Sequence, residues 1–302
     1  MKLKQVKPFL KWAGGKTQLL QDIENKFPYK KDDKFSYIEP FVGSGAVLFW
    51  VLNNFPNLKS AVINDINEDL INSYKTIKLN VSNLIPVLKS YENEYHFLAE
   101  KLEDKKKYYY NKRELFNMRT ADSIIQTALF IFLNRTCFNG LYRVNKKNGF
   151  NVPIGSYKKP TICDEDNLLL ISESLKKVEI LSGDFEQTVS YVSGNTIFYF
   201  DPPYKPISET SSFNSYAKNE FNDEEQIRLK KFCDKLDSLG TQWILSNSDV
   251  KGKNPNDDFF DDLFSRYQIN RVMAKRSINA SASKRGQLTE LLILNQGVCN
   301  EI

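Results

Sequence analysis

The residues best suited to chemistry in this chain are four consecutive ones, Asp201-Pro202-Pro203-Tyr204. They follow Asn195–Phe200, a β-branched and aromatic run that predicts a buried strand. Proline cannot continue a central strand, so Asp201 is expected at the rim of a sheet, where open α/β folds bind ligands. A carboxylate, the carbonyls of a proline-stiffened turn and an aromatic face together fit a planar ring that carries an exocyclic amino group. The alternative is an ordinary strand-ending turn whose tyrosine packs.

A second candidate site is the turn Phe41-x-Gly43-x-Gly45, which has a predicted strand before it and an apolar helix after it. The next predicted strand ends at Asp65. Glycines let the backbone approach a ligand, and a carboxylate in this place can hold two ribose hydroxyls. Leu48 stands where a dinucleotide-binding turn would carry a third glycine, so a ligand with a ribose and no pyrophosphate fits better. A glycine-rich turn without a ligand is the alternative.

Positive charge is concentrated in residues 101–160. This segment holds 13 lysines and arginines against 4 acids, a net charge of +9, whereas the rest of the chain carries −4 of the total of +5. Such a block indicates a polyanion footprint, and a solvated basic face is the alternative. Within it, residues 134–145 and 150–155 interleave Asn and Arg with aromatic side chains, the types that read base edges and enter base stacks. A helix end with packed aromatics would have a similar composition.

Several function classes are disfavoured. His96 is the only histidine and the four cysteines are far apart, so we expect no metal site, no disulfide framework and no Ser-His-Asp hydrolase. Gly14-Gly15-Lys16 lacks the earlier glycine of a phosphate-binding loop, because Leu10 stands in its place. No run of 18 apolar residues is present, so we expect no membrane contact and a soluble, cytoplasmic protein.

The pattern of the chain predicts an α/β fold. Short apolar strands are expected at 35–39, 60–64, 178–181, 195–200, 241–246, 272–275 and 289–295, with helices at 17–26, 46–52, 223–239 and 257–264. Residues 68–136 have a charged, helical texture, and loop residues follow to about 160. We therefore expect a Rossmann-like sheet built from segments 1–79 and 166–302, with a helical domain inserted at 80–165.

The tetrapeptide at 201–204 resembles the signature of the amino-methyltransferases, which methylate the exocyclic nitrogen of adenine or cytosine in DNA with S-adenosylmethionine. A related family that methylates protein glutamine has Asn at the first position, so Asp201 favours a nucleobase. Residues 9–16 closely resemble the N-terminal segment of the Dam-type, alpha-group adenine methyltransferases. This resemblance implies that Trp12 and Lys16 contact the cofactor, with Lys16 pairing with the methionine carboxylate.

Gly183-Asp184-Phe185 resembles the segment of that family beside the cofactor adenine. The resemblance implies that Asp184 accepts from the adenine amino group and that Phe185 packs on the ring, with a plain strand-ending turn as the alternative. S-adenosylmethionine has a ribose and no pyrophosphate, so it also suits the abbreviated turn. The expected cofactor-binding residues are therefore Trp12, Lys16, Phe41, Gly43, Gly45, Asp65, Asp184, Phe185 and Asp201.

The stretch Phe138-Asn-Gly-Leu-x-Arg143-x-Asn, with Asn-Val-Pro153, resembles the recognition hairpin of methyltransferases that act on GATC. The resemblance implies that Arg143 contacts the first guanine, that Phe138 and Leu141 enter the duplex and that Pro153 touches a thymine. Phe138 stands where the chromosomal enzymes usually have tyrosine, and it matches a restriction-modification branch, as do the loops Ser208–Phe213 and Ser281–Gly286. The expected DNA contacts are Arg135, Phe138, Asn139, Leu141, Arg143, Asn145, Lys146, Lys147 and Pro153.

The sequence therefore predicts a bacterial, DNA-associated methyltransferase that modifies adenine N6 in double-stranded DNA, at GATC, and protects host DNA from a cognate nuclease. Asp201 and the carbonyl of Pro202 would accept the two amino hydrogens of a flipped adenine while Tyr204 stacks on its ring. Three alternatives stay open: a cytosine N4 methyltransferase, a protein or RNA methyltransferase, and a catalytically silent DNA-binding module. The sequence does not distinguish a monomer from a weak dimer.

Overall fold

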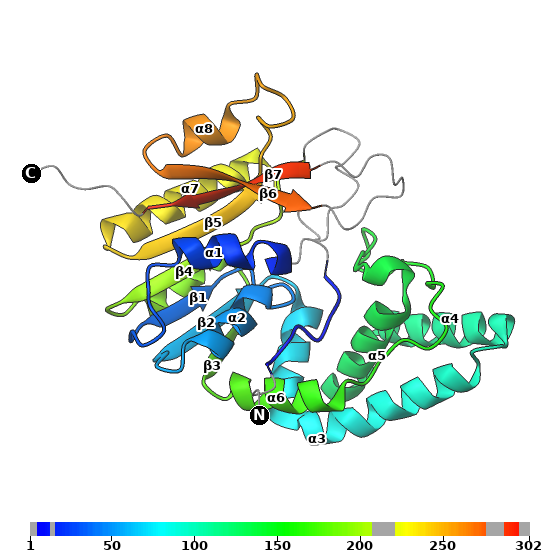
Figure 1. Cartoon of the computed structure of the whole chain (residues 1–302). Coiled ribbons are helices and arrows are strands. Elements are labelled where there is room, and N and C mark those ends of the chain that lie inside the picture. Colours follow the sequence, from blue (N-terminus) through cyan, green and yellow to red (C-terminus); the bar gives the residue numbers. More distant parts are fainter. Residues whose placement is uncertain (1–4, 13–15, 207–220, 276–286, 296–302) are drawn as a thin grey trace, which may run out of the picture.

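The computed structural model describes residues 5–12, 16–206, 221–275 and 287–295. Its centre is a seven-stranded sheet in the order β3-β2-β1-β4-β5-β7-β6 (Figure 1). The first five strands in this order are parallel, and β7 is antiparallel to both of its neighbours. The strands are β1 (Ser36–Glu39), β2 (Ser60–Asp65), β3 (Val178–Ser182), β4 (Thr196–Phe200), β5 (Gln242–Ser248), β6 (Gln268–Lys275) and β7 (Gln287–Leu294). The predicted α/β sheet is confirmed.

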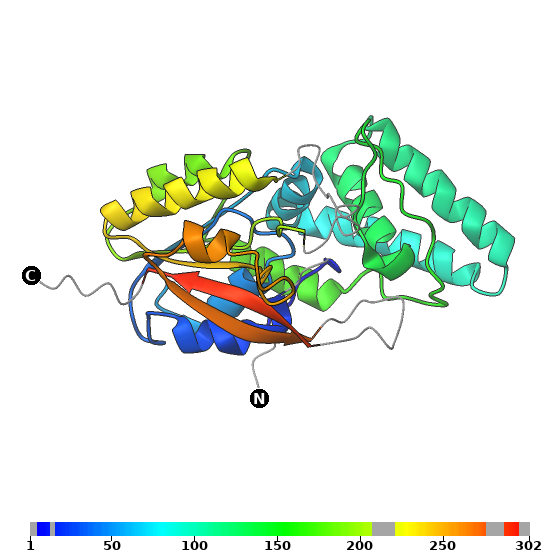
Figure 2. The ribbon, with the colours of Figure 1, turned by 90° about the horizontal axis from the view of Figure 1, so that it is seen from above.

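Helices cover both faces of the sheet, which explains why β1 and β4 are buried at every position. Successive strand residues point to opposite faces. Tyr37 and Tyr199 pack in the core beneath α1 (Leu20–Lys26) and α2 (Ala46–Asn54), while Ile38 and Phe198 pack with α7 (Asp223–Ser238) and α8 (Phe259–Leu263). Seen from above, α1 lies on one side of the sheet and α7 on the other (Figure 2). Continuous apolar strands are typical of a sheet covered in this way.

The long connection from β2 to β3 is helical and extends beside the sheet (Figure 1). It contains α3 (Glu68–Phe97), α4 (Leu102–Met118), α5 (Ser123–Thr136), the 3-10 turn η2 (Phe138–Gly140) and α6 (Glu165–Leu175). Asp122 begins α5 by accepting from two backbone N–H groups, as a helix-capping aspartate does. The division at 80 and 165 stays a prediction; α3 runs through the first boundary and is kinked at Asn80. Among the described helices, none is long and apolar enough to cross a membrane.

Three asparagine side chains fix the irregular segment 5–12 against the body of the protein. Each accepts from one backbone N–H and donates to the carbonyl of the same residue, as a neighbouring strand would. The pairs are Asn53 with Val6, Asn167 with Lys7, and Asn134 with Lys11. The predicted helix at 17–26 follows this segment as a 3-10 turn, η1 (Lys16–Gln18), and then α1. The helix α6 and the 3-10 helix η3 (Phe185–Tyr191) were not predicted.

Candidate active site

Asp201 lies directly after β4, at the carboxyl end of the parallel strands, as its position after a buried run predicts. The strand β4 pairs with β1, and β1 pairs on its other side with β2. The site therefore lies between β1 and β4, where the order of the strands in the sheet reverses direction. The side chain of Asp201 is 22% exposed, and its Oδ1 accepts from Lys16 Nζ at 2.8 Å and from Ser246 Oγ at 3.2 Å. The carboxylate is therefore held in one orientation at the rim of the sheet.

The rest of the tetrapeptide is braced by residues that sequence reasoning did not single out. Gln226 Nε2 donates to the carbonyl of Pro203 at 3.1 Å, and Tyr204 donates its hydroxyl to Glu290 at 2.8 Å. Ser246 is fully buried and also contacts the Tyr199 hydroxyl at 2.9 Å. The sequence does hold a signal for Ser246. Residues 246–248 are polar at the end of an apolar strand, and buried polar groups in such a place need hydrogen-bond partners.

Lys16 adopts a contact that differs from the expected one. Its ammonium group pairs with Asp201 and lies 4.4 Å from the centre of the Tyr204 ring, and its side chain is 5% exposed. The contact of Lys16 with the methionine carboxylate of the cofactor, which the resemblance implies, stays a prediction. Burial raises the pKa of Asp201, and the Lys16 charge and hydrogen bond oppose that rise. Lys16 therefore favours the charged form of the carboxylate.

The glycine turn is shaped as the sequence predicts. Gly43 and Gly45 both have positive φ angles, 48° and 75°. A Cβ at Gly45 would lie 2.5 Å from the Tyr74 hydroxyl oxygen, so glycine is required there for space as well as for conformation. The ring of Phe41 packs on Phe185 at a centroid distance of 5.3 Å, within the core of the sheet face that α7 covers.

Asp65 stands at the end of β2, beside this turn. Its carboxylate accepts from the backbone N–H of Gly43 at 3.1 Å and of Asn67 at 2.9 Å. Burial raises the pKa of Asp65 to about 6 despite these hydrogen bonds. The next residue, Ile66, is 56% exposed although it is apolar. Ile66 was missed by sequence reasoning; an apolar residue just past a strand-ending acid is the signal that could have found it.

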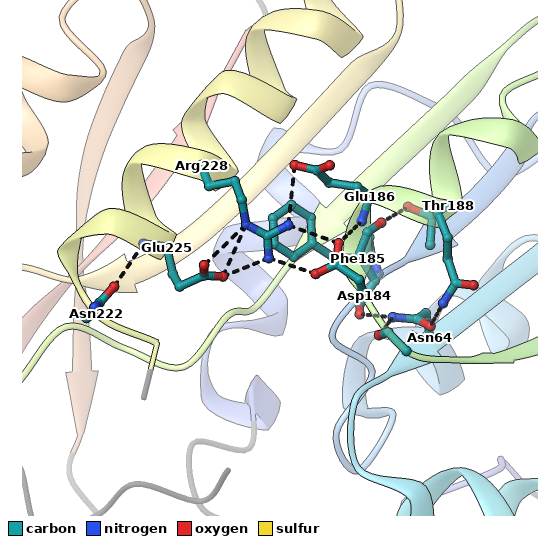
Figure 3. A network of polar contacts seen from close by, with 11 residues as sticks. Asn64, Asp184, Phe185, Glu186, Thr188, Asn222, Glu225 and Arg228 are labelled. Atoms are coloured by element: carbon teal, nitrogen blue, oxygen red, sulfur yellow. Dashed lines mark hydrogen bonds and ion pairs between the residues drawn. The ribbon is translucent and has the colours of Figure 1, made fainter. Parts of the chain in front are cut away.

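The third predicted turn, at the end of β3, holds Asp184 and Phe185 in different surroundings. Asp184 is exposed and forms a two-pronged ion pair with Arg228 of α7 (Figure 3). Phe185 is only 3% exposed, and the Arg228 guanidinium lies 4.2 Å from its ring centre. The Phe185 ring is thus largely buried against protein, and its packing on the cofactor adenine stays a prediction.

The predicted recognition residues form an exposed loop after α5. Backbone bridges join Cys137 to Ile154 and Val144 to Phe150, so the segment folds back on itself as an irregular hairpin. Phe138 is 51% exposed, a large apolar side chain open to solvent. The side chains of Asn139, Arg143, Asn145, Lys146, Lys147 and Pro153 are also exposed, and Leu141 is half-buried. Packed aromatics were the alternative that composition left open: Tyr142 and Phe150 are buried, whereas Phe138 lies outside.

Two residues of this loop are partly occupied in shaping it. Arg143 Nε donates to Asn151 Oδ1 at 2.7 Å, which holds the guanidinium against the returning strand. Asn145 Oδ1 accepts from the backbone N–H groups of Lys147 and Gly149, at 2.9 and 3.0 Å. Asn145 therefore stabilises the tip of the hairpin, a turn-forming role typical of asparagine.

Arg135 does not join the exposed set. Its Nη2 donates to the carbonyl of Phe9 at 2.7 Å, and burial lowers the pKa of its guanidinium. The side chain thereby holds the segment 5–12 against α5, and its contact with DNA stays a prediction. Two other basic residues of the block also contact protein: the buried Lys105 donates to two backbone carbonyls, and the half-buried Lys112 lies 3.6 Å from the centre of the Tyr91 ring.

The side chain of Asn134 connects the N-terminal segment 5–12 to the hairpin after α5. Asn134 accepts from the Lys11 N–H at 2.8 Å and donates to the Lys11 carbonyl at 2.7 Å and to the Gly140 carbonyl at 3.0 Å. Beside it, Trp12 stacks on Tyr142 of the hairpin with ring centres 5.5 Å apart and an angle of 19°. The segment next to the glycine turn and the exposed hairpin are therefore in direct contact.

Some predicted residues lie outside the described ranges: Gly14, Gly15 and the loops Ser208–Phe213 and Ser281–Gly286. Within the ranges that are described, no group of three or more His, Cys, Asp or Glu side chains could hold a metal ion.

The fold and these groups define a class of protein. A mostly parallel sheet with a glycine turn and a strand-ending acid is typical of proteins that bind nucleoside-containing ligands, and the rim of the sheet adds a carboxylate, an aromatic ring and an exposed basic hairpin. The profile of the D12 class N6 adenine-specific DNA methyltransferases matches residues 12–278. The chain belongs to this family. It is thus an S-adenosylmethionine-dependent, adenine-specific DNA methyltransferase with a Rossmann-like catalytic sheet.

Similar proteins agree over nearly the whole chain. The type II methyltransferase M.MjaIII of Methanocaldococcus jannaschii is 51% identical over 296 residues, which cover 96% of this chain and 99% of that protein. The type II methyltransferase M1.LlaDCHI of Lactococcus lactis subsp. cremoris is 38% identical, covering 97% and 96%. The DNA adenine methylase of Haemophilus influenzae is 37% identical, covering 95% and 93%.

Proposed function

We propose that this enzyme methylates adenine N6 in double-stranded GATC sites, with the target base turned out of the duplex, and that it protects DNA from a partner restriction endonuclease. The observation that carries the proposal is the contact between the exposed hairpin and the segment beside the glycine turn. Asn134 binds both Lys11 and Gly140, and Trp12 stacks on Tyr142. A duplex held by the hairpin would thus be fixed relative to Asp201.

The residues around the glycine turn fit a nucleoside cofactor. Gly43 and Gly45 give the turn its left-handed backbone conformation, and the carboxylate of Asp65 stands at the same edge to accept from ribose hydroxyls. We assign Trp12, Phe41 and Asp184 to the same site, with Phe185 packed behind Phe41 in the core. Ile66 offers an exposed apolar surface for the adenine ring. S-adenosylmethionine, when bound, supplies an electrophilic sulfonium methyl group.

Asp201 would act on the target amine by accepting a hydrogen bond. The lone pair of an aromatic amino group is delocalised into its ring, so the amine is a weak nucleophile. Accepting one hydrogen at Asp201 and the other at the carbonyl of Pro202 favours a tetrahedral nitrogen whose lone pair is free. The charged form of Asp201, which Lys16 favours, also stabilises the positive charge that develops on the nitrogen. Tyr204, fixed by Glu290, is placed to stack on the base.

For the duplex, we assign base contacts to Arg143 and entry into the base stack to Phe138 and Leu141. Arginine can bind guanine through two hydrogen bonds in the major groove, and exposed apolar side chains act as wedges between base steps. Asn139 and Pro153 lie in the same exposed loop, and Lys146 and Lys147 at its tip suit phosphates. Turning the adenine out of the stack costs a few kcal/mol, which these contacts must offset.

Protection against a nuclease is supported by the names of two relatives, both called type II methyltransferases. The GATC assignment is supported by the hairpin sequence and its exposure. The test is transfer of labelled methyl groups to matched duplexes that carry GATC or a single changed base pair, followed by challenge with endonucleases that cleave GATC. We expect label and protection only for the GATC duplex. Equal labelling of another site would refute the specificity and leave the adenine chemistry standing.

A further inference from the structure

One arginine of α7 grips the turn at the end of β3 (Figure 3). Arg228 Nη1 donates to Asp184 Oδ1 at 3.1 Å, and Nη2 donates to Asp184 Oδ2 at 2.7 Å. The same guanidinium also donates from Nη2 to Glu225 Oε2 at 2.7 Å, and its Nη1 lies 3.4 Å from Glu186 Oε1. A planar guanidinium with carboxylates on two sides has little freedom to turn, so the orientation of Asp184 is fixed.

The hydrogen bonds to Asp184 leave a defined vacancy among its acceptor positions. An ionised carboxylate offers about four lone-pair positions. Asp184 Oδ1 accepts from Arg228 and from the backbone N–H of Glu186 at 2.9 Å, whereas among the described residues Oδ2 accepts from Arg228 alone. The side chain is 49% exposed, so a ligand can reach it. Oδ2 can therefore accept one more hydrogen bond.

The turn is also fixed relative to the glycine-turn site. The backbone N–H of Gly183 donates to the carbonyl of Asp65 at 3.1 Å, and the carbonyl of Gly183 accepts from Asn64 Nδ2 at 2.9 Å. Asn64 is 1% exposed and is held in turn by Gln187 at 2.9 Å. Asp184 thus stands at a set distance from the acid that ends β2.

The charge of the cluster sets what Asp184 can bind. The Arg228 hydrogen bonds hold the pKa of Asp184 below its ordinary value, so the carboxylate stays ionised and can only accept. An ionised carboxylate favours an amino donor and disfavours a carbonyl oxygen in the same place. Glu186 and Glu225 add two further negative charges around a single guanidinium, which keeps the cluster unattractive to anionic groups.

We propose that Arg228 is a positioning residue that orients Asp184 as a single-site acceptor for the exocyclic amino group of the cofactor's adenine, and so sets the selection of adenine over its oxo counterpart hypoxanthine. This inference rests on the proposed cofactor placement beside Asp65 and Asp184. Arg228 itself touches no ligand; it acts through Asp184 and by covering Phe185.

The test measures binding of S-adenosylhomocysteine and of S-inosylhomocysteine, which differ by the amino or oxo group at C6 and by the hydrogen that the oxo base carries on N1, using titration calorimetry on the full chain. The wild type should prefer the adenosyl ligand at least about tenfold, as sites built for a donor reject an analogue without it. Arg228→Lys keeps the charge but loses the two-pronged geometry, and it should reduce that preference several-fold with duplex affinity unchanged. Asp184→Asn should reduce it at least as much, and adding Arg228→Lys to it should change nothing further.

The controls separate the possible failures. Arg266→Lys changes an arginine that pairs with Asp237 at 3.4 Å, and it should leave the preference unaltered. If Arg228→Lys does not fold, Glu225→Gln loosens the same guanidinium and should give a smaller reduction. If Asp184→Asn keeps the wild-type preference, the proposed cofactor placement is refuted. If Asp184→Asn loses the preference and the Arg228 and Glu225 variants keep it, the placement stands and Arg228 is only a brace between α7 and the turn.

Discussion

Replacing Asn134 by alanine should damage catalysis beyond its effect on stability, because this side chain ties the segment 5–12 to the hairpin. Asn134 is 1% exposed and makes three hydrogen bonds, two to Lys11 and one to Gly140. Losing them leaves backbone groups of Lys11 and Gly140 without partners, at about 1–3 kcal/mol for each group that water cannot reach. Because water can reach part of this region, we expect a total loss of about 2–4 kcal/mol in the free energy of unfolding.

Asn167 supplies a matched control. It makes the same pair of bonds four residues earlier, to Lys7, at 3.0 and 2.9 Å, and it has no contact with the hairpin among the described hydrogen bonds. Asn167→Ala should lose about 1–3 kcal/mol of stability. Urea unfolding gives both stabilities, and methyl transfer is measured where both variants are more than 95% folded by the same curves. We expect kcat/KM to fall about tenfold or more for Asn134→Ala, equivalent to ~1.4 kcal/mol, and to stay within about twofold for Asn167→Ala. Equal effects of the two variants on kcat/KM would refute the coupling.

Three further results are expected. Burial raises the pKa of Asp65 to about 6, so this carboxyl takes up a proton as the pH drops through about 6. Affinity for S-adenosylhomocysteine, measured by calorimetry, should fall over the same pH range. The pH dependence should be absent in Asp65→Asn. Ser246→Ala removes a 3.2 Å hydrogen bond to Asp201 and should lower the single-turnover rate constant of methyl transfer about tenfold while leaving duplex affinity unchanged; an unaltered rate constant would remove Ser246 from the positioning of Asp201. Arg143→Ala should relax selection at one guanine, worth about 1–3 kcal/mol, whereas Lys147→Ala should weaken binding to all sequences alike; a uniform loss for Arg143→Ala would make it a phosphate contact.

Most of the fold could be predicted from local sequence patterns. Apolar strands, glycine turns and the prolines after β4 act on their immediate neighbours, so Asp201 and Asp65 could be placed at strand ends from the sequence. Helix boundaries that depend on packing were less accessible: η3 begins at Phe185, where the sequence suggested only a turn.

The partners of the site residues were not predictable in the same way. Asn134 binds a residue 123 positions away, and Arg228 meets Asp184 across 44 positions. Such pairs are set by the tertiary structure, and residue type alone does not choose among many possible partners. The same limit explains Arg135, whose charge suggested DNA but whose guanidinium is held by the Phe9 carbonyl.

The most direct test of the account concerns Asp201 and the base that it serves. Wild type and Asp201→Ala are incubated with methyl-labelled S-adenosylmethionine and a duplex containing one GATC site, the DNA is digested to nucleosides, and duplex affinity is measured in parallel. We predict N6-methyladenine as the labelled product of the wild type, no product from Asp201→Ala, and duplex dissociation constants that agree within about twofold, since this carboxylate serves the amine rather than the duplex. Label on cytosine N4, or near-normal turnover by Asp201→Ala, would contradict the account.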